Sequence, residues 1–320
     1  MQQVTSNIAS NNVGAFAELF DYYAANKCFP PDSKVGMIFE GGALRGVMSW
    51  AYSAALAEFI DPHAFARLYG SSSGALNAVY FLSDMSDIAL SIYVENATDK
   101  KCTNMLKFPN VLDVDWLIDT WIFGAKKFPV EKILGNPIPI TITLTRLLDG
   151  KPGYFDSATA TGHTLNQAMK ATCYTPLLSN GSQTIDGVVY GDGAIADAIP
   201  YDRALADGCT HIICLLTRPR GYRKNRNGFL SGLFSRLRLS HHTRDYRAAF
   251  IHSEADYNAL LDRLHGGKDL PVPTLVVSPA DRTEVPGNIE TRPEVIEKHG
   301  VAAFQGLKSQ LANAFPVLKT

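Results

Sequence analysis

A serine in a glycine-spaced turn is the first residue of this chain whose surroundings suggest chemistry. Ser72 is the middle residue of GSSSG, the pentapeptide from Gly70 to Gly74. Strand-like residues precede the pentapeptide and helix-like residues follow it. A serine on a sharp turn from strand to helix stands clear of the backbone, and the glycines let the chain fold past it without Cβ clashes. The spacing therefore predicts Ser72 as a nucleophile, and the alternative interpretation is a turn of small residues without catalysis.

A second glycine turn lies upstream of the serine, in the segment VGMIFEGGALRG. An apolar strand runs into two glycines, and apolar residues at helical spacing follow the arginine. Backbone amides at the N-terminus of a helix have no partner inside it, so they can hold a negative oxygen. Placed beside Ser72, this turn would form an oxyanion hole for acyl transfer. Its residues are Gly41, Gly42, Ala43, Leu44, Arg45 and Gly46.

Two nucleotide-binding interpretations of this turn compete with the oxyanion hole. Asp61 lies twenty residues after Gly41, as in a dinucleotide site, but Ala43 occupies the second glycine position of that fingerprint. A phosphate-binding P-loop is excluded because no Gly-Lys-Ser/Thr follows.

A third segment, GDGAIADAIP, supplies a base. Asp192 precedes Gly193 and Ala194 and lies between a strand and an apolar turn, whereas other Asp-Gly pairs of the chain fit hairpin turns or a helix end. A carboxylate is a poor base at neutral pH unless desolvation raises its pKa. The apolar neighbours of Asp192 are compatible with such a pocket, and we expect Asp192 to accept the proton of Ser72.

In this order the three segments resemble the motifs of the patatin-like phospholipases. That family carries G-G-G-x-R-G, G-x-S-x-G and D-G-G or D-G-A, which stand here as GGALRG, GSSSG and DGA. The resemblance implies an α/β fold of three layers, with a mostly parallel central sheet and helices on both faces. It also implies a Ser72–Asp192 dyad that hydrolyses lipid esters through an acyl-enzyme, with amides of Gly42, Ala43 and Leu44 on the oxyanion. The chain departs from the pattern at Ala43, where alanine costs about 1 kcal/mol if φ is positive.

Two other functions stay open. An α/β-hydrolase triad could combine Ser72 and Asp192 with a histidine later in the chain. A patatin-like fold could also act as a regulator or a lipid-binding module with little turnover. The histidines after Asp192 are His211, His241, His242, His252, His265 and His299.

Composition predicts one α/β domain without a membrane span. The chain has 320 residues, 46% of them hydrophobic, and no apolar run long enough to cross a bilayer. No secretory signal pattern opens the sequence, so we expect a cytoplasmic protein, with peripheral membrane contact as an addition. Five cysteines without C-x-x-C spacing and the lack of a loop of spaced acidic ligands predict neither metal nor cofactor.

Basic residues are concentrated in one stretch. Nine basic residues and one acidic residue lie from Arg218 to Arg247, a local charge of +8 in a chain whose net charge is −1. Within it, Phe229–Leu237 predicts an amphipathic helix. This helix could lie on an anionic membrane surface, or pack on the core with its arginines in solvent. No nucleic-acid-reading motif accompanies the charge, and the sequence carries no signal for oligomeric state.

The alternation of strand and helix from Val35 to Leu82 predicts a mostly parallel sheet. We expect a helical N-terminal extension over 1–32, a patatin-like catalytic domain over 33–285, and a C-terminal helical region over 286–320 packed on the same domain. Residues 85–135 predict a helical insertion, which forms either a lid over the cleft or part of the core.

Overall fold

The computed structural model describes residues 8, 13–108, 110–125, 128–176, 178–224, 239–266 and 270–319. The predicted amphipathic helix Phe229–Leu237 lies outside these residues, so its membrane contact stays a prediction.

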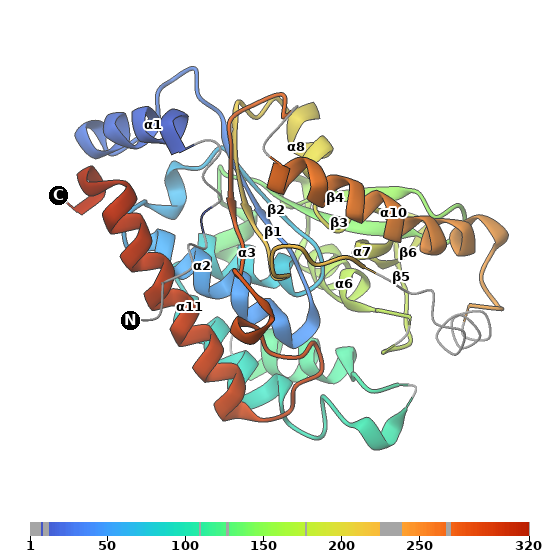
Figure 1. Cartoon of the computed structure of the whole chain (residues 1–320). Coiled ribbons are helices and arrows are strands. Elements are labelled where there is room, and N and C mark those ends of the chain that lie inside the picture. The colour runs from blue at the N-terminus through green and yellow to red at the C-terminus, as the bar shows by residue number, and fades with distance from the viewer. Residues whose placement is uncertain are drawn as a thin grey trace.

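Within the described residues, a mostly parallel sheet of eight strands forms the centre of the fold (Figure 1). The strand order is β5-β6-β3-β2-β1-β7-β8, and β4 also pairs with β3. The neighbouring strands in the part β3-β2-β1-β7-β8 run parallel. The pairs β3–β4, β3–β6 and β5–β6 are antiparallel. The strands are β1 (Val35–Phe39), β2 (Arg67–Gly70), β3 (Ile140–Arg146), β4 (Pro152–Asp156), β5 (Gln183–Ile185), β6 (Val188–Asp192), β7 (His211–Leu215) and β8 (Thr274–Val277).

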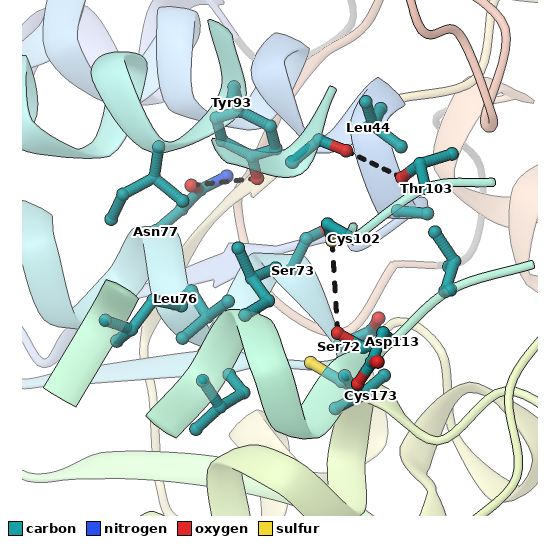
Figure 2. A pocket seen from close by; sticks show the side chains of 18 of the residues that line it. Leu44, Ser72, Ser73, Leu76, Asn77, Tyr93, Cys102, Thr103, Asp113 and Cys173 are labelled. Carbon is teal, nitrogen blue, oxygen red and sulfur yellow. Dashed lines mark hydrogen bonds between the residues drawn. The ribbon is translucent and has the colours of Figure 1, made fainter. Parts of the chain in front are cut away.

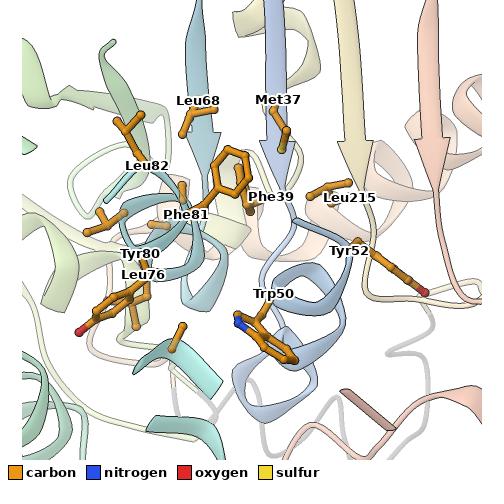
Figure 3. Close-up of a cluster of buried hydrophobic side chains, with 14 of the residues drawn as sticks. Met37, Phe39, Trp50, Tyr52, Leu68, Leu76, Tyr80, Phe81, Leu82 and Leu215 are labelled. Carbon is orange, nitrogen blue, oxygen red and sulfur yellow. The ribbon is translucent and has the colours of Figure 1, made fainter. Parts of the chain in front are cut away.

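The parallel strands are largely buried because both of their faces are covered. Every residue of β1 and β8 is buried, as expected for parallel strands between two layers of helices. On one face, alternate β1 residues such as Met37 and Phe39 join a core with Trp50 and Phe81 (Figure 3). On the opposite face, Ile38 belongs to a second core. The fold therefore has the three layers that the resemblance implied.

Helices from distant parts of the chain cover these two faces. The first core includes residues of α2 (Val47–Ala57), α3 (Ser73–Leu82), α6 (Gly162–Cys173) and α11 (Pro293–Ala314). The second core includes residues of α8 (Tyr201–Ala206) and α10 (Arg244–Gly266). Figure 1 shows α11 and α10 on different sides of the sheet.

The two ends of the described chain pack together. Helix α1 (Val13–Asn26) matches the helix expected in the N-terminal extension. Phe20 of α1 contacts Phe315, just beyond α11, edge-on with ring centroids 4.8 Å apart. Both rings are buried in the first core.

The predicted insertion is helical only in short pieces. It contains α4 (Ser86–Ser91), π-helices at Ile92–Ala97 and Trp116–Ala125, a 3₁₀ turn at Met105–Lys107 and α5 (Val130–Leu134). Ile118 and Ile122 are fully buried in the first core, so this region contributes to packing. No helix among the described residues has the length and apolar character needed to cross a bilayer.

Candidate active site

The strands β2 and β6 pair with the same edge of β3, and their ends point toward each other. This arrangement determines where the two residues of the predicted dyad lie. Gly70, the last residue of β2, pairs with Ile142, whereas Asp192, the last residue of β6, pairs with Leu144. Because β4 pairs with the other edge of the same part of β3, β2 and β6 must share one edge. Two residues of strand span about 7 Å. The sheet therefore brings Asp192 and the turn that carries Ser72 to one place.

Ser72 occupies a strained turn between β2 and α3. Its backbone lies at φ 53° and ψ −133°, a conformation that side-chain-bearing residues rarely adopt and that is concentrated at functional sites. The glycines on either side are required by close contacts. A Cβ at Gly74 would overlap the carbonyl of Phe39, and a Cβ at Gly70 would overlap the backbone of Ala75. The local sequence thus selects the sharp turn.

A threonine at the end of α6 holds this turn. The hydroxyl of Thr172 accepts a hydrogen bond from the Ser72 amide at 2.8 Å and donates one to the carbonyl of Thr143 at 2.8 Å. Thr172 and Thr143 are fully buried. Ser72 is therefore tied through Thr172 to the strand on which β2 and β6 meet.

The predicted oxyanion turn touches the nucleophile turn. A side chain at Gly41 would overlap the Ser71 carbonyl and approach the Cβ of Ser72. Ala43 has a φ of 51°, so the family's third glycine position does have left-handed backbone. The strain anticipated for alanine therefore applies here.

The amides of the oxyanion turn differ in what they bind. Gly42 donates its amide to the Ser73 hydroxyl at 3.1 Å, and Leu44 donates to the carbonyl of Asn288 at 3.2 Å. Within the described residues, the amide of Ala43 has no hydrogen bond. The amides of Gly42 and Leu44 thus fix the turn, and the Ala43 amide is available to a ligand.

Asp192 ends β6 and caps the short helix α7 (Gly193–Ala196). Its carboxylate accepts a hydrogen bond from the Ala194 amide at 3.0 Å, and its carbonyl accepts one from the Thr145 hydroxyl at 2.6 Å. A Cβ at Gly193 would overlap the carbonyl of Thr143. Asp192 is 4% exposed, so its carboxylate lies in a largely dry environment.

Two cavities meet at Ser72. One is narrow and apolar, about 70 Å³, and is lined by side chains of α3 and of the insertion (Figure 2). The other is about 300 Å³, contains Asp192, and is lined by the cationic side chains of Arg45, Arg218 and Lys224. Ser72 and Ala43 line both cavities. The predicted nucleophile therefore lies between an apolar space and a basic one.

Comparison with known proteins decides the family. A family model described as patatin-like phospholipase matches residues 37–205, more than half of the 320 residues. The chain belongs to the patatin-like phospholipases.

Two proteins similar to this patatin-like chain have low sequence identity to it. The uncharacterized protein YjjU of Escherichia coli strain K12 is 24% identical over 196 residues, which cover 58% of this chain and 52% of YjjU. The match therefore spans about half the length of that curated relative. The structure of VipD from Legionella pneumophila aligns with a TM-score of 0.46 and 12% identity, over 88% of this chain and 67% of that chain.

The arginine of the patatin glycine motif is buried with unmet hydrogen-bonding capacity. Arg45 is 6% exposed, and its Nε has no hydrogen-bond partner among the described residues. Its pKa is lowered to about 10, first by burial and then by the charge of Arg218, while the carboxylate of Glu40 acts in the opposite direction. The two arginines face the same cavity, which can offset their repulsion by binding an anion.

Several residues that support the site were not found by sequence reasoning. Buried Glu40 accepts hydrogen bonds from the Thr217 amide at 2.6 Å and from the Tyr257 hydroxyl at 2.5 Å. The Thr217 hydroxyl also donates to the carbonyl of Gly41 at 2.8 Å. These contacts fasten the start of the oxyanion turn to the end of β7 and to α10. No local motif marks Thr217 or Tyr257, because their roles depend on long-range packing.

Cys173 lies beside Ser72 in the apolar cavity (Figure 2). The pKa of its thiol is raised to about 12, first by burial and then by the charge of Asp192, while hydrogen bonding with Ser72 acts in the opposite direction. Both members of the predicted dyad therefore act on this one thiol, in agreement with the convergence of β2 and β6.

The structure places no histidine of the described chain in the two cavities at Ser72, where a Ser-His-Asp triad would need one. All eight histidines lie in described parts of the chain, and none lines either cavity around Ser72. His211, for example, packs edge-on against Phe16 of α1. The geometry favours a dyad over a triad.

Proposed function

We propose that this chain hydrolyses phospholipids or lysophospholipids as a serine acyl hydrolase with a Ser72–Asp192 dyad. The observation that carries the proposal is the position of Ser72, where the apolar cavity meets the cavity that contains Asp192. A lipid ester has the same division, with an apolar chain on one side of its carbonyl and a polar group on the other. Such a substrate would place its carbonyl at Ser72.

The proposed mechanism uses the hydroxyl of Ser72, the carboxylate of Asp192 and the backbone amide of Ala43. Ser72 Oγ attacks the ester carbonyl while Asp192 takes the hydroxyl proton and passes it to the leaving alcohol. Water then attacks the acyl carbonyl while Asp192 takes one of its protons. The bond between the carbonyl carbon and Ser72 Oγ breaks to release the fatty acid, and Asp192 returns the proton to Ser72 Oγ. The amide of Ala43 holds the oxyanion, and the amides of Gly42 and Leu44 keep the turn in place. A single such donor is typically worth about 10² to 10³ in rate.

The basic cavity supports a substrate with an anionic head group. Arg45, Arg218 and Lys224 line it, and guanidinium groups form strong, charge-assisted hydrogen bonds with phosphate. The carboxylates of Glu40 and Asp192 line the same cavity, so its three cations exceed its acids by one charge, which a phosphate would balance and a neutral acylglycerol would not. We therefore place phospholipids ahead of neutral glycerides as substrates.

The alternative function is a patatin-like regulator or lipid-binding module with little turnover. Its support in the sequence is Ala43, which replaces a glycine. The φ of 51° at Ala43 is the backbone conformation that glycine would allow there, so the turn keeps its shape. A strained but correctly folded turn favours catalysis over the binding module.

A fluorophosphonate probe tests the proposal because it reacts with activated serines. The wild-type protein should be labelled, Ser72→Ala should not, and Asp192→Asn should react about 10² to 10⁴ times more slowly. Ser71→Ala is the matched control, since the neighbouring Ser71 hydroxyl is buried without a hydrogen-bond partner among the described residues, and this variant should be labelled like the wild type. Folded wild-type protein that resists labelling would favour the binding module.

A further inference from the structure

Residues 99–110, a short excursion of the insertion, expose several large apolar side chains. Met105 is 51% exposed, Leu106 is 95% exposed and Phe108 is 60% exposed. The other five exposed large apolar side chains of the described chain are scattered over separate elements. Single exposed apolar residues need no explanation, but a cluster within four residues marks an interaction site.

Lysines accompany these apolar residues. Lys100, Lys101 and Lys107 are exposed, and no ion pair within the described residues engages them. From position 99 to position 110 the sequence holds these three lysines and one acid, Asp99, for a net charge of +2. Apolar side chains flanked by unpaired cations match an anionic lipid surface, where both kinds of group find partners.

The excursion has an ordered base that also forms part of the apolar cavity. Thr103 and Leu112 form an antiparallel bridge, and the amide of Asp113 donates to the carbonyl of Cys102 at 2.8 Å. All four of these residues line the apolar cavity at Ser72. In Figure 1 the turquoise segment near position 100 extends from the lower right of the molecule. One short stretch of chain thus connects an exposed apolar tip to the wall of the cavity.

We propose that this tip, residues 105–108 with Lys100 and Lys101, docks the protein on anionic membranes. The apolar side chains enter the boundary between head groups and acyl chains, and the lysines contact the anionic head groups. Docking in this way places the apolar cavity next to the lipid. This tip is a different segment of the sequence from the Arg218–Arg247 stretch, for which membrane contact is predicted from sequence alone.

Co-sedimentation with vesicles tests the docking tip. Wild-type protein should bind vesicles that contain phosphatidylglycerol, bind pure phosphatidylcholine weakly, and be released by high salt. The double variant Leu106→Ser/Phe108→Ser should bind about tenfold less or weaker still, since it removes the two most exposed apolar anchors. Leu148→Ser/Ile251→Ser is the matched control, because those side chains are 70% and 68% exposed on other elements. It should bind like the wild type.

A second pair of variants isolates the charges. Lys100→Glu/Lys107→Glu should lose the preference for anionic vesicles, whereas Lys151→Glu/Lys298→Glu, with the same charge change at exposed sites elsewhere, should retain it. The proposal is overturned if wild-type protein does not bind, or if the serine double variant binds as well as its control. It is also overturned if binding disappears only in Arg236→Glu/Arg238→Glu, which would assign membrane contact to the other basic stretch.

Vesicle binding is independent of the chemistry at Ser72. The variants of the tip should hydrolyse a short-chain, water-soluble ester at the wild-type rate, because none of the substituted residues lines the cavities at Ser72. Ser72→Ala should bind vesicles normally. Failure of docking and failure of the proposed hydrolysis would therefore be seen in different measurements.

Discussion

The hydroxyl of Thr172 accepts a hydrogen bond from the backbone amide of Ser72 at 2.8 Å. This bond satisfies a buried donor in a strained turn, one hundred residues away along the chain. Thr172→Val keeps the shape of the side chain but leaves the amide without a partner, which costs about 1–3 kcal/mol of unfolding free energy. We expect urea denaturation to show that loss and fluorophosphonate labelling of Ser72 to slow.

Thr172→Ser is the control for this change, because it retains the hydroxyl. It should keep most of the labelling rate. A valine variant as stable and as reactive as the wild type would show that Thr172 does not position the turn.

Tyr257 supports the oxyanion turn from the far side through its hydrogen bond to Glu40. We expect Tyr257→Phe to lower the unfolding free energy by about 1–3 kcal/mol, since Glu40 is buried and loses a donor. Tyr52→Phe is the matched control. The Tyr52 hydroxyl is buried and has no hydrogen-bond partner in the described parts of the chain, so removing it should leave stability unchanged or higher. Equal effects of the two substitutions in urea denaturation would contradict this role for Tyr257.

Ala43 allows a test of backbone strain. Because its φ is positive, Ala43→Gly should remove backbone strain and raise the unfolding free energy by up to about 1 kcal/mol. The greater freedom of glycine in the unfolded chain partly offsets this gain. The same substitution at Ala302, exposed inside α11, should cost about 1 kcal/mol. Thermal unfolding measures both. The labelling rate of Ala43→Gly should stay within a few-fold of wild type, since the amide donor is retained, and a large loss would argue against the assigned role of that amide.

The raised pKa of Asp197 predicts that the stability of the protein depends on pH. Burial raises its pKa from 3.8 to about 6, although the Tyr154 hydroxyl donates to it at 2.8 Å and opposes the shift. The folded protein therefore holds this proton more tightly than the unfolded chain does. The resulting stabilisation is complete below about pH 4 and is lost as the pH rises through about 6.

Asp197→Asn removes this titration. We expect the unfolding free energy of the variant, relative to wild type, to rise from about pH 4 to about pH 7 in urea denaturation. Asp281→Asn is a contrasting control. Hydrogen bonds from Thr283 lower the pKa of exposed Asp281, so its contribution changes only at lower pH and the difference should be flat over this range. A flat difference for Asp197→Asn would contradict the shift.

Local signals in the sequence were sufficient for the fold class but not for the supports of the site. The three glycine and aspartate motifs lie at strand ends, where a few consecutive residues determine both turn and chemistry. The order of strands was not readable, because pairing of β6 with β3 depends on contacts nearly fifty residues apart. Thr172, Glu40 and Tyr257 escaped notice for the same reason. Each has an ordinary residue type, and only packing gives it a role.

The meeting of β2 and β6 on β3 makes Thr143 a spacer. It is the single residue between the partners of Gly70 and Asp192, and it has no chemistry of its own in the proposed reaction. Inserting one residue beside Thr143 would lengthen the gap between the two strand ends by about 3.3 Å. That is more than the tolerance of a hydrogen bond. The distance between Ser72 and Asp192 is therefore set by β3, a strand to which neither residue belongs.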